Sequence, residues 1–160
     1  MERVVVALAV YAALAGLALW RPNVGRIAIG IFFALMAVVV NGLVLTVAPG
    51  LFVAMAEEVP FLWYRELMLA VVSPLPQAFG VFMVVFELTI AALILSRGTA
   101  RLTGLLVGAA FLVGITPLGL YTVTNLLLAA TLVYLFWIDP ANPWRLAPTP
   151  LATGSTRRDP

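Results

Sequence analysis

The stretch from Phe79 to Ser96, FGVFMVVFELTIAALILS, is apolar enough to cross a lipid bilayer, yet it carries one charged side chain, Glu87, near its middle. A membrane-spanning helix needs about 20 mostly apolar residues, because each residue rises about 1.5 Å and the hydrocarbon core is about 30 Å thick. A charge at the centre of such a helix costs about 2.5–3.5 kcal/mol on insertion scales. Glu87 therefore needs a hydrogen-bonding partner, a proton or a water-filled cavity.

The composition of the whole chain is typical of a membrane protein. Of its 160 residues, 64% are hydrophobic and 10% are charged, whereas soluble domains are about 45–50% apolar and about 25% charged. Backbone groups in lipid must be hydrogen-bonded within the protein, which favours helices. We therefore expect an all-α fold, an integral membrane helical bundle in which residues 1–138 form a single transmembrane domain.

The residue types that are missing exclude several kinds of chemistry. The chain contains no Cys, His or Lys. Iron–sulfur clusters, Cys/His zinc sites, His-ligated haem and Ser-His-Asp or Cys-His catalytic groups are therefore excluded. We expect no catalytic residue, no metal site and no covalently bound cofactor, so any redox cofactor is organic or belongs to another subunit. The net charge of +2 is carried by the ends and short loops, which indicates membrane topology rather than a nucleic-acid partner.

Five segments are predicted to span the membrane: residues 4–20, 27–48, 77–96, 102–115 and 118–137. The first is at the lower length limit for a span, and its alternative is a signal peptide. The last two come from about 36 uncharged residues, which at 1.5 Å per residue are too long for one crossing. We place the break between them at the helix-breaking sequence Thr116-Pro117-Leu118-Gly119.

Two pairs of small residues predict close contacts between helices. Ala12 and Gly16 in the first span, and Gly104 and Gly108 in the fourth, have the small-xxx-small spacing that lets helix backbones approach each other. For the first pair, an Ala-rich helix without a special contact is an equal alternative. The helix that carries the second pair is also a candidate for an exposed apolar face that binds a partner subunit.

The segment Pro49–Pro76 is too interrupted to span the membrane. We expect one or two short helices that lie on or dip into the interface, where Trp63 and Tyr64 favour the headgroup level. Long connections of this kind are often functional lids. Glu57, Glu58 and Arg65 are candidate gatekeepers at the outer mouth of a site. The alternative is that these three residues, together with Glu66, form a solvated face.

The distribution of Arg predicts the orientation of the chain. With five spans, seven of the nine Arg fall on one side, and the positive-inside rule makes that side cytoplasmic. The amino terminus and the Pro49–Pro76 segment then lie outside. Residues 139–160 are rich in Pro and polar residues, so we expect a flexible cytoplasmic tail. The predicted location is a plasma membrane of the bacterial inner-membrane type.

With this orientation, three polar side chains lie at similar depths in the membrane. Asn41 and Asn125 are about seven residues from the outer ends of their helices, and Glu87 is about ten, so their depths differ by about 5 Å at 1.5 Å per residue. We hypothesise a polar cluster in the middle to outer half of the bundle, covered by the Pro49–Pro76 segment. Further hydroxyl groups fall in the same zone: Thr89, Tyr121, Thr122 and Thr124.

The chemistry of this cluster depends on Glu87. Burial disfavours the ionised form of a carboxyl group, so we expect a neutral Glu87 at pH 7 unless Arg65 or another donor reaches it. A protonated carboxyl can donate a hydrogen bond to a quinone carbonyl, or it can exchange protons as in transporters. The alternative is a packing role, with Glu87 hydrogen-bonded to Asn125 or a Thr.

Residues 26–137, about 112 of the 160, resemble the DoxX-like family of small four-helix membrane proteins. The resemblance lies in Arg26 before IAIGIFF, in Phe86-Glu87-Leu88, in the short turn from Arg97 to Arg101 and in the paired final helices. It implies a four-helix core, to which Val4–Trp20 adds a helix. It also implies, for some family members, association with quinone-linked sulfur oxidation or with membrane oxidoreductase complexes. Glu87 and Arg101 match the family, and no role is assigned to Arg101.

Three functions are compatible with these observations. The first is a non-catalytic or quinone- or lipid-binding subunit of a membrane oxidoreductase system, with Glu87 as a buried polar anchor. The second is a small proton-coupled transporter or carrier that uses Glu87. The third is a structural scaffold for a partner protein or a second copy of the chain. An autonomous enzyme is not expected, because no nucleotide loop, metal cage or nucleophile–base pair is present.

Overall fold

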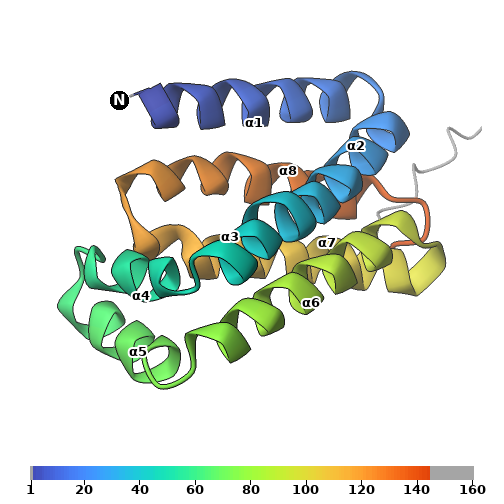
Figure 1. Ribbon diagram of the computed structural model, residues 1–160. Coiled ribbons are helices and arrows are strands. Elements are labelled where there is room, and N and C mark those ends of the chain that lie inside the picture. Colours follow the sequence, from blue (N-terminus) through green and yellow to red (C-terminus); the bar gives the residue numbers. More distant parts are fainter. Residues whose placement is uncertain (1, 145–160) are drawn as a thin grey trace, which may run out of the picture.

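The computed structural model describes residues 2–144, and for residues 2, 3, 120 and 121 it describes the backbone alone. Every regular element in this range is helical, which confirms the predicted all-α class (Figure 1). The elements are α1 (Glu2–Trp20), α2 (Pro22–Leu35), the π-helical segment η1 (Met36–Asn41), α3 (Gly42–Val47), α4 (Gly50–Glu57), α5 (Leu62–Val72), α6 (Pro76–Leu95), α7 (Gly98–Ile115), the 3-10 segments η2 (Thr116–Leu118) and η3 (Leu120–Thr124), and α8 (Asn125–Ile138).

The lengths and hydropathy of these helices fit a membrane protein. Among the described residues, three helical stretches are long and apolar enough to cross a bilayer: Pro22–Val47, Pro76–Leu95 and Gly98–Leu118. The first of them runs without a break through α2, η1 and α3. Val4–Trp20 and Thr122–Ile138 are apolar but shorter.

The helices α1, α2, α6, α7 and α8 pack side by side in a closed ring, each against the next and α8 against α1. Their turns divide the bundle into two ends (Figure 1). At the arginine end, α1 turns into α2 and α6 turns into α7, which brings together Arg21, Arg26, Arg97 and Arg101. At the roof end, α4 and α5 form a helical hairpin below α3 and beside the start of α6.

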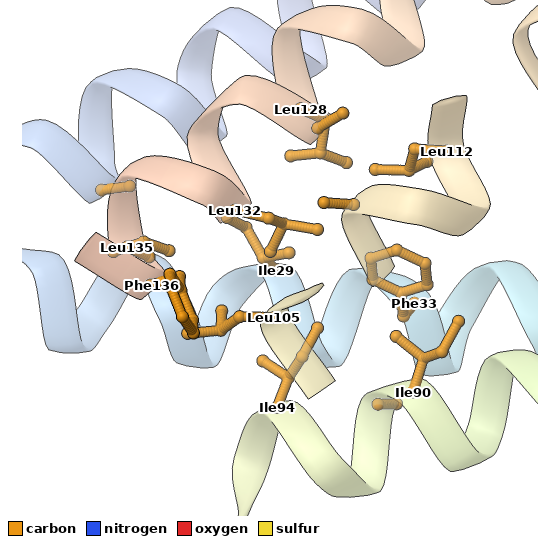
Figure 2. Close-up of a cluster of buried hydrophobic side chains, with 14 of the residues drawn as sticks. Ile29, Phe33, Ile90, Ile94, Leu105, Leu112, Leu128, Leu132, Leu135 and Phe136 are labelled. Atoms are coloured by element: carbon orange, nitrogen blue, oxygen red, sulfur yellow. The ribbon is translucent and has the colours of Figure 1, made fainter. Parts of the chain in front are cut away.

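The interior of the ring is filled by branched and aromatic side chains from four helices (Figure 2). Ile29 of α2, Ile90 and Ile94 of α6, and Leu105 of α7 are fully buried, and they meet the Leu side chains of α8. The outward faces are also apolar, with many exposed Val, Leu and Phe side chains. Such an extensive apolar surface marks contact with lipid or protein rather than with water.

Gly104 and Gly108 allow α7 to pack closely against α6. A Cβ atom on Gly104 would lie 2.6 Å from the backbone nitrogen of Ile94, and one on Gly108 would lie 3.1 Å from the side chain of Ile90. The close packing predicted for this pair is therefore confirmed. Both glycines are buried inside the bundle, whereas Leu106 and Val113 on the other side of α7 are exposed, so an apolar face of this helix remains open to a partner.

The close contact between α1 and α2 occurs at a different position from the one predicted. No described atom lies within 4 Å of a Cβ placed on Gly16, so the Ala12–Gly16 pair mediates no contact in the described chain. Instead, a Cβ on Gly25 would overlap the backbone of Ala18. Both residues flank the turn at Arg21, where the two helices are necessarily closest.

The predicted break at Pro117 is present, but it extends further along the chain. Helix α7 begins at Gly98 and ends at Ile115, and the 3-10 segments carry the chain to Thr124 before α8 begins. The Thr122 hydroxyl holds this irregular stretch together: it accepts from the Gly119 N–H at 3.0 Å and donates to the Thr116 carbonyl at 2.6 Å. The fourth span is thus longer than predicted, and the last regular helix is shorter.

The first residues assigned to the flexible tail are held against the bundle. Asp139 and Asn142 are buried, and the Asn142 amide donates to the Phe136 carbonyl at 3.1 Å. The Trp144 N–H in turn donates to the Asn142 side-chain oxygen at 2.9 Å. A flexible tail therefore begins no earlier than residue 145, and residues 145–160 lie outside the described range.

Replacing Gly104 by Ala is expected to lower the stability of the protein by about 1–3 kcal/mol, the usual cost of overpacking, because the new methyl group meets the backbone of Ile94. Gly16→Ala is the matched control, because it places the same group in open space. It should leave stability unchanged or raise it by up to about 1 kcal/mol, since Ala favours helix. Thermal unfolding in detergent, followed by circular dichroism, compares the two. A Gly104→Ala variant as stable as the parent would contradict the close α6–α7 contact.

Candidate functional site

A cavity of about 220 Å³ lies at the roof end of the bundle, between the α4–α5 hairpin and the ring of long helices. The Pro49–Pro76 segment thus covers a cavity, whereas the sequence led us to expect a polar cluster beneath it. The residues that line the cavity come from α4, α5, η1, α6, α7 and η2. They are Asn41, Phe52, Met55, Ala56, Tyr64, Met68, Val72, Phe79, Phe82, Met83, Phe111, Ile115 and Leu118.

The lining of the cavity is almost entirely apolar and rich in aromatic and Met side chains. Within the described part of the chain, Asn41 and Tyr64 are its polar side chains. Ligand sites are typically apolar pockets with a few well-placed polar groups that set the orientation of the ligand. Met side chains are flexible and polarizable, so they adapt to ligands of irregular shape.

Asn41 connects the cavity with the buried carboxyl group. Its side-chain N–H donates to Oε2 of Glu87 at 2.7 Å. Glu87 itself is 5% exposed and does not belong to the cavity lining. The carboxyl group therefore lies behind the amide, and Asn41 is the group that a ligand in the cavity would meet. The partner that the structure assigns to Glu87 is this amide and not Arg65.

Asn41 reaches Glu87 because η1 interrupts the regular helix. Ile29, Phe33 and Ala37 are buried, and Asn41 continues their spacing of four residues. With 3.6 residues per turn, such a row drifts around an α-helix. The wider turns of a π-helix counter this drift, so Asn41 stays on the side of Phe33 and Ala37. Segments of π-helix occur frequently at functional sites.

A second buried polar pair lies close to the first. The Tyr11 hydroxyl of α1 donates to Oδ1 of Asn125 at 3.0 Å, and Asn125 is 4% exposed. Tyr11 also interacts electrostatically with Glu87 and packs edge-on against Phe32. Tyr11 is therefore hydrogen-bonded to Asn125 and lies within electrostatic range of Glu87.

Sequence reasoning did not identify Tyr11 as a member of the polar cluster. The available signal was a single hydroxyl side chain in the middle of an otherwise apolar segment, Val4–Trp20. Buried Tyr hydroxyls generally find a hydrogen-bonding partner. The same rule that directed attention to Asn41 and Asn125 therefore applied to Tyr11 as well.

Other hydroxyl groups of the predicted cluster lie elsewhere. Thr89 is exposed, and its hydroxyl donates to the Val85 carbonyl of its own helix at 2.8 Å. Its expected place in the cluster is therefore wrong, because a Thr can satisfy its hydroxyl within the preceding turn. Thr122 holds the 3-10 segments together, as described above. The side chain of Tyr121 lies outside the described residues.

The charged residues of the roof do not line the cavity. Glu57 and Glu58 are exposed at the end of α4, Glu66 is exposed on α5, and Arg65 is half-buried. Their arrangement resembles a solvated face more than a set of gatekeepers, since Glu57, Glu58 and Arg65 are absent from the lining.

Tyr64 attaches the roof to the bundle. Its hydroxyl donates to the Gly114 carbonyl near the end of α7 at 2.6 Å. Burial raises the pKa of Tyr64, so the hydroxyl keeps its proton and remains a donor at neutral pH. The neighbouring Trp63 is exposed, as expected for an interfacial side chain. The sequence placed both rings at the interface, but Tyr64 points inward.

Arg101, the second position of the family resemblance, lies at the opposite end from the cavity. Its Nη2 forms an ion pair with Oδ1 of Asp139 at 2.6 Å. The pair joins the start of α7 to the residue that follows α8. Arg101 therefore has a structural contact in this chain, and it is remote from Glu87.

Comparisons with known proteins found no match: no family model, no curated protein and no solved structure matches this chain. The resemblance to the DoxX-like family therefore rests on the short sequence motifs alone. The geometry of the cavity and of the polar pairs is the basis on which a function can be argued.

Asn41 and Glu87 are expected to stabilise the fold jointly. In a double-mutant cycle with Asn41→Ala and Glu87→Ala, we expect a coupling free energy of about 0.5–2 kcal/mol, the range for buried hydrogen bonds in membranes. Asn41→Ala combined with Thr89→Ala is the matched control, since Thr89 lies on α6 like Glu87 but is exposed. The effects of these two changes on the free energy of unfolding should add. Unfolding in mixed micelles measures both cycles, and additive effects of Asn41→Ala and Glu87→Ala would argue against the bond.

Tyr64→Phe is expected to loosen the roof. The change removes the hydrogen bond to the Gly114 carbonyl and leaves that acceptor unpaired, at a cost of about 1–3 kcal/mol. Hydrogen exchange of α4 and α5 should accelerate, while exchange of α7 and α8 stays slow. Tyr134→Phe, on α8, provides the control for the loss of a hydroxyl. Equal exchange in the parent and Tyr64→Phe proteins would show that other contacts hold the hairpin.

Proposed function

We propose that this chain is a five-span, DoxX-like integral membrane protein that binds a lipophilic ring compound of the quinone class in the roof-end cavity. Its role is that of a non-catalytic subunit of a membrane oxidoreductase system. The observation that carries the proposal is the aromatic, Met-rich cavity whose inner polar group, Asn41, is hydrogen-bonded to the buried Glu87.

The size of the cavity suits one substituted ring. An apolar cavity of about 150 Å³ is known to bind benzene, and the present cavity measures about 220 Å³. Four Phe side chains line it, from α4, α6 and α7. Aromatic rings favour stacked and edge-on contacts with one another, so these walls suit a flat ring better than a compact polar solute.

The polar groups of the cavity match the oxygen atoms of a quinone. An Asn side chain has two N–H donors and one acceptor oxygen. With one N–H directed at Glu87, the other N–H and the oxygen of Asn41 remain available to a carbonyl or a hydroxyl group of the ligand. Glu87 orients the amide and can hold or release a proton next to it. The hydroxyl oxygen of Tyr64, whose proton is donated to the Gly114 carbonyl, can still accept a hydrogen bond on the roof side.

The cavity lies next to a groove on the outer surface. Phe79 and Phe82 line the cavity, and they also line an outer groove of about 370 Å³ together with Val71 and Leu75. Phe82 is exposed on the surface of α6. A lipophilic molecule from the bilayer would enter past these two rings, with its tail left in the groove between α5 and α6.

Five spans are supported by the exposed Trp side chains. Trp20, Trp137 and Trp144 are exposed at the arginine end, and Trp63 is exposed at the roof end. Trp is enriched at both membrane interfaces, which supports the proposal that α1 and α8 cross the bilayer together with the three longer helices. The arginine end is then cytoplasmic, and the cavity opens in the outer half of the bilayer of a plasma membrane.

The chain contains no Cys or His to hold a metal redox centre, so we place electron transfer in another protein. This chain would bind and orient the quinone and exclude water from it, while a partner subunit supplies the electrons. The extensive apolar surface offers room for such a subunit or for a second copy of the chain. The DoxX-like resemblance favours this arrangement over a carrier that works alone.

The proposal predicts that a quinone co-purifies with the protein. The full chain is extracted into native-lipid nanodiscs, and its bound small molecules are measured by mass spectrometry. Asn41→Leu should reduce the bound quinone about tenfold or more, since it removes the polar anchor while keeping an apolar wall. Thr46→Val is the matched control, because Thr46 lies on the same continuous helix but is exposed and bonded to the Gly42 carbonyl.

Two results would contradict quinone binding. Equal amounts of quinone in the parent and Asn41→Leu proteins would indicate lipid contamination rather than a site. A parent protein that carries no quinone but retains a second protein, unaffected by Asn41→Leu, would favour the scaffold.

A further inference from the structure

A second pocket lies at the arginine end, remote from the roof-end cavity. It measures about 310 Å³ and is enclosed by the start of α2, the end of α8 and the residues that follow α8. Asn23 and Arg26 form one side, and Leu135, Ile138 and Asp139 form the other. Its walls are thus partly polar and partly apolar, unlike the walls of the roof-end cavity.

Arg26 lacks a carboxylate partner among the described residues. Its Nη1 donates to the Ile94 carbonyl at the end of α6, and its Nε is buried without a hydrogen-bonding partner. The nearby carboxylate, Asp139, is already engaged. Its Oδ1 accepts from Arg101 at 2.6 Å and from the Ala141 N–H at 2.8 Å.

Among residues 2–144, the charges around this pocket do not balance. Arg26 and Arg101 interact electrostatically with each other and with Asp139. The other charged groups at this end, Arg21 and Arg97, are exposed and also positive. Within the described chain, Asp139 is the one acidic side chain here, because Glu57, Glu58 and Glu66 lie at the roof end and Glu87 inside the bundle. A half-buried guanidinium in this position is stabilised by an additional anion.

The level of the pocket in the membrane identifies the type of anion. Trp20, Trp137 and Trp144 are exposed around the same end, and Trp marks the depth of lipid headgroups. A guanidinium recognises phosphate oxygens with directed hydrogen bonds, and basic pockets between membrane helices bind anionic headgroups. Leu135 and Ile138 offer an apolar wall on which an acyl chain can lie.

We propose that the pocket beside Arg26 binds the phosphate group of an anionic phospholipid. Arg26 provides the positive charge, and Asn23 lies at the same side of the pocket. Arg26, Arg101 and Asp139 together carry one net positive charge, which a single anion balances. This site is independent of quinone binding in the roof-end cavity, since the two share no residue.

Lipid binding to the purified full chain in detergent, measured by native mass spectrometry, tests the proposal. Phosphatidylglycerol is the anionic probe, phosphatidylcholine is the zwitterionic control, and inorganic phosphate is the soluble competitor. Arg26→Gln should weaken binding of phosphatidylglycerol at least fivefold and leave phosphatidylcholine unchanged. Arg97→Gln is the matched control: it removes the same charge from the same end, but at an exposed position, and should change binding less than twofold.

A variant with the opposite expectation guards against a folding defect in Arg26→Gln. Asp139→Asn keeps the hydrogen-bonding shape but removes the competing negative charge, so it should bind phosphatidylglycerol at least twofold more tightly. A misfolded protein would not gain affinity. Unchanged or weaker binding by Asp139→Asn would overturn the charge argument.

The remaining outcomes are equally decisive. Equal losses in Arg26→Gln and Arg97→Gln would show attraction by net charge alone and would overturn the site. Displacement of phosphatidylglycerol by millimolar inorganic phosphate, with the same dependence on Arg26, would assign the pocket to soluble phosphate and overturn the lipid as its ligand. Loss confined to Arg26→Gln, without competition by phosphate, supports the proposal.

Discussion

A carboxyl group inside an apolar helical bundle must find its hydrogen bonds within the protein, and the bond from Asn41 to Glu87 meets this requirement. The bond joins the longest helical stretch to α6 at the middle of the bundle. The π-helical segment η1 makes this bond possible, because its wide turns direct the Asn41 side chain toward α6. The cavity borders this amide, so the polar group that stabilises the bundle is the same group that a bound molecule would meet.

The two ends of the bundle solve the problem of polar groups in different ways. At the roof end, the Tyr64 hydroxyl is bonded to a carbonyl of α7 and closes a largely apolar space. At the arginine end, Arg26 and Arg101 are half-buried. Because Arg101 is paired with Asp139, Arg26 has no counterion among the described residues. An apolar ligand would complement the first arrangement, and an anion would complement the second, as proposed above.

The helical class, the three longest helices and the break at Pro117 could be predicted, because they depend on local hydropathy and on helix-breaking residues. The contact between Asn41 and Glu87 could be proposed from their depths alone, although depth does not determine which face a side chain occupies. For that reason Thr89 was wrongly included in the polar cluster, and Tyr11 was not recognised as a member of it. Asp139 was overlooked because a Pro-rich sequence resembles a flexible tail until its side chains are seen to bond to the bundle.

By itself, the sequence determined that the chain is an apolar helical bundle, that Arg gathers at one end and that Cys and His chemistry is excluded, since composition and hydropathy are properties of the chain. Only the tertiary structure decided that Glu87 lies behind Asn41 rather than in the cavity, that Tyr11 joins the cluster and that Arg26 has no carboxylate partner among residues 2–144. The physical reason is that these facts depend on helix rotation. A single π-helical segment changes which side chains face one another, and hydropathy along the chain does not record it.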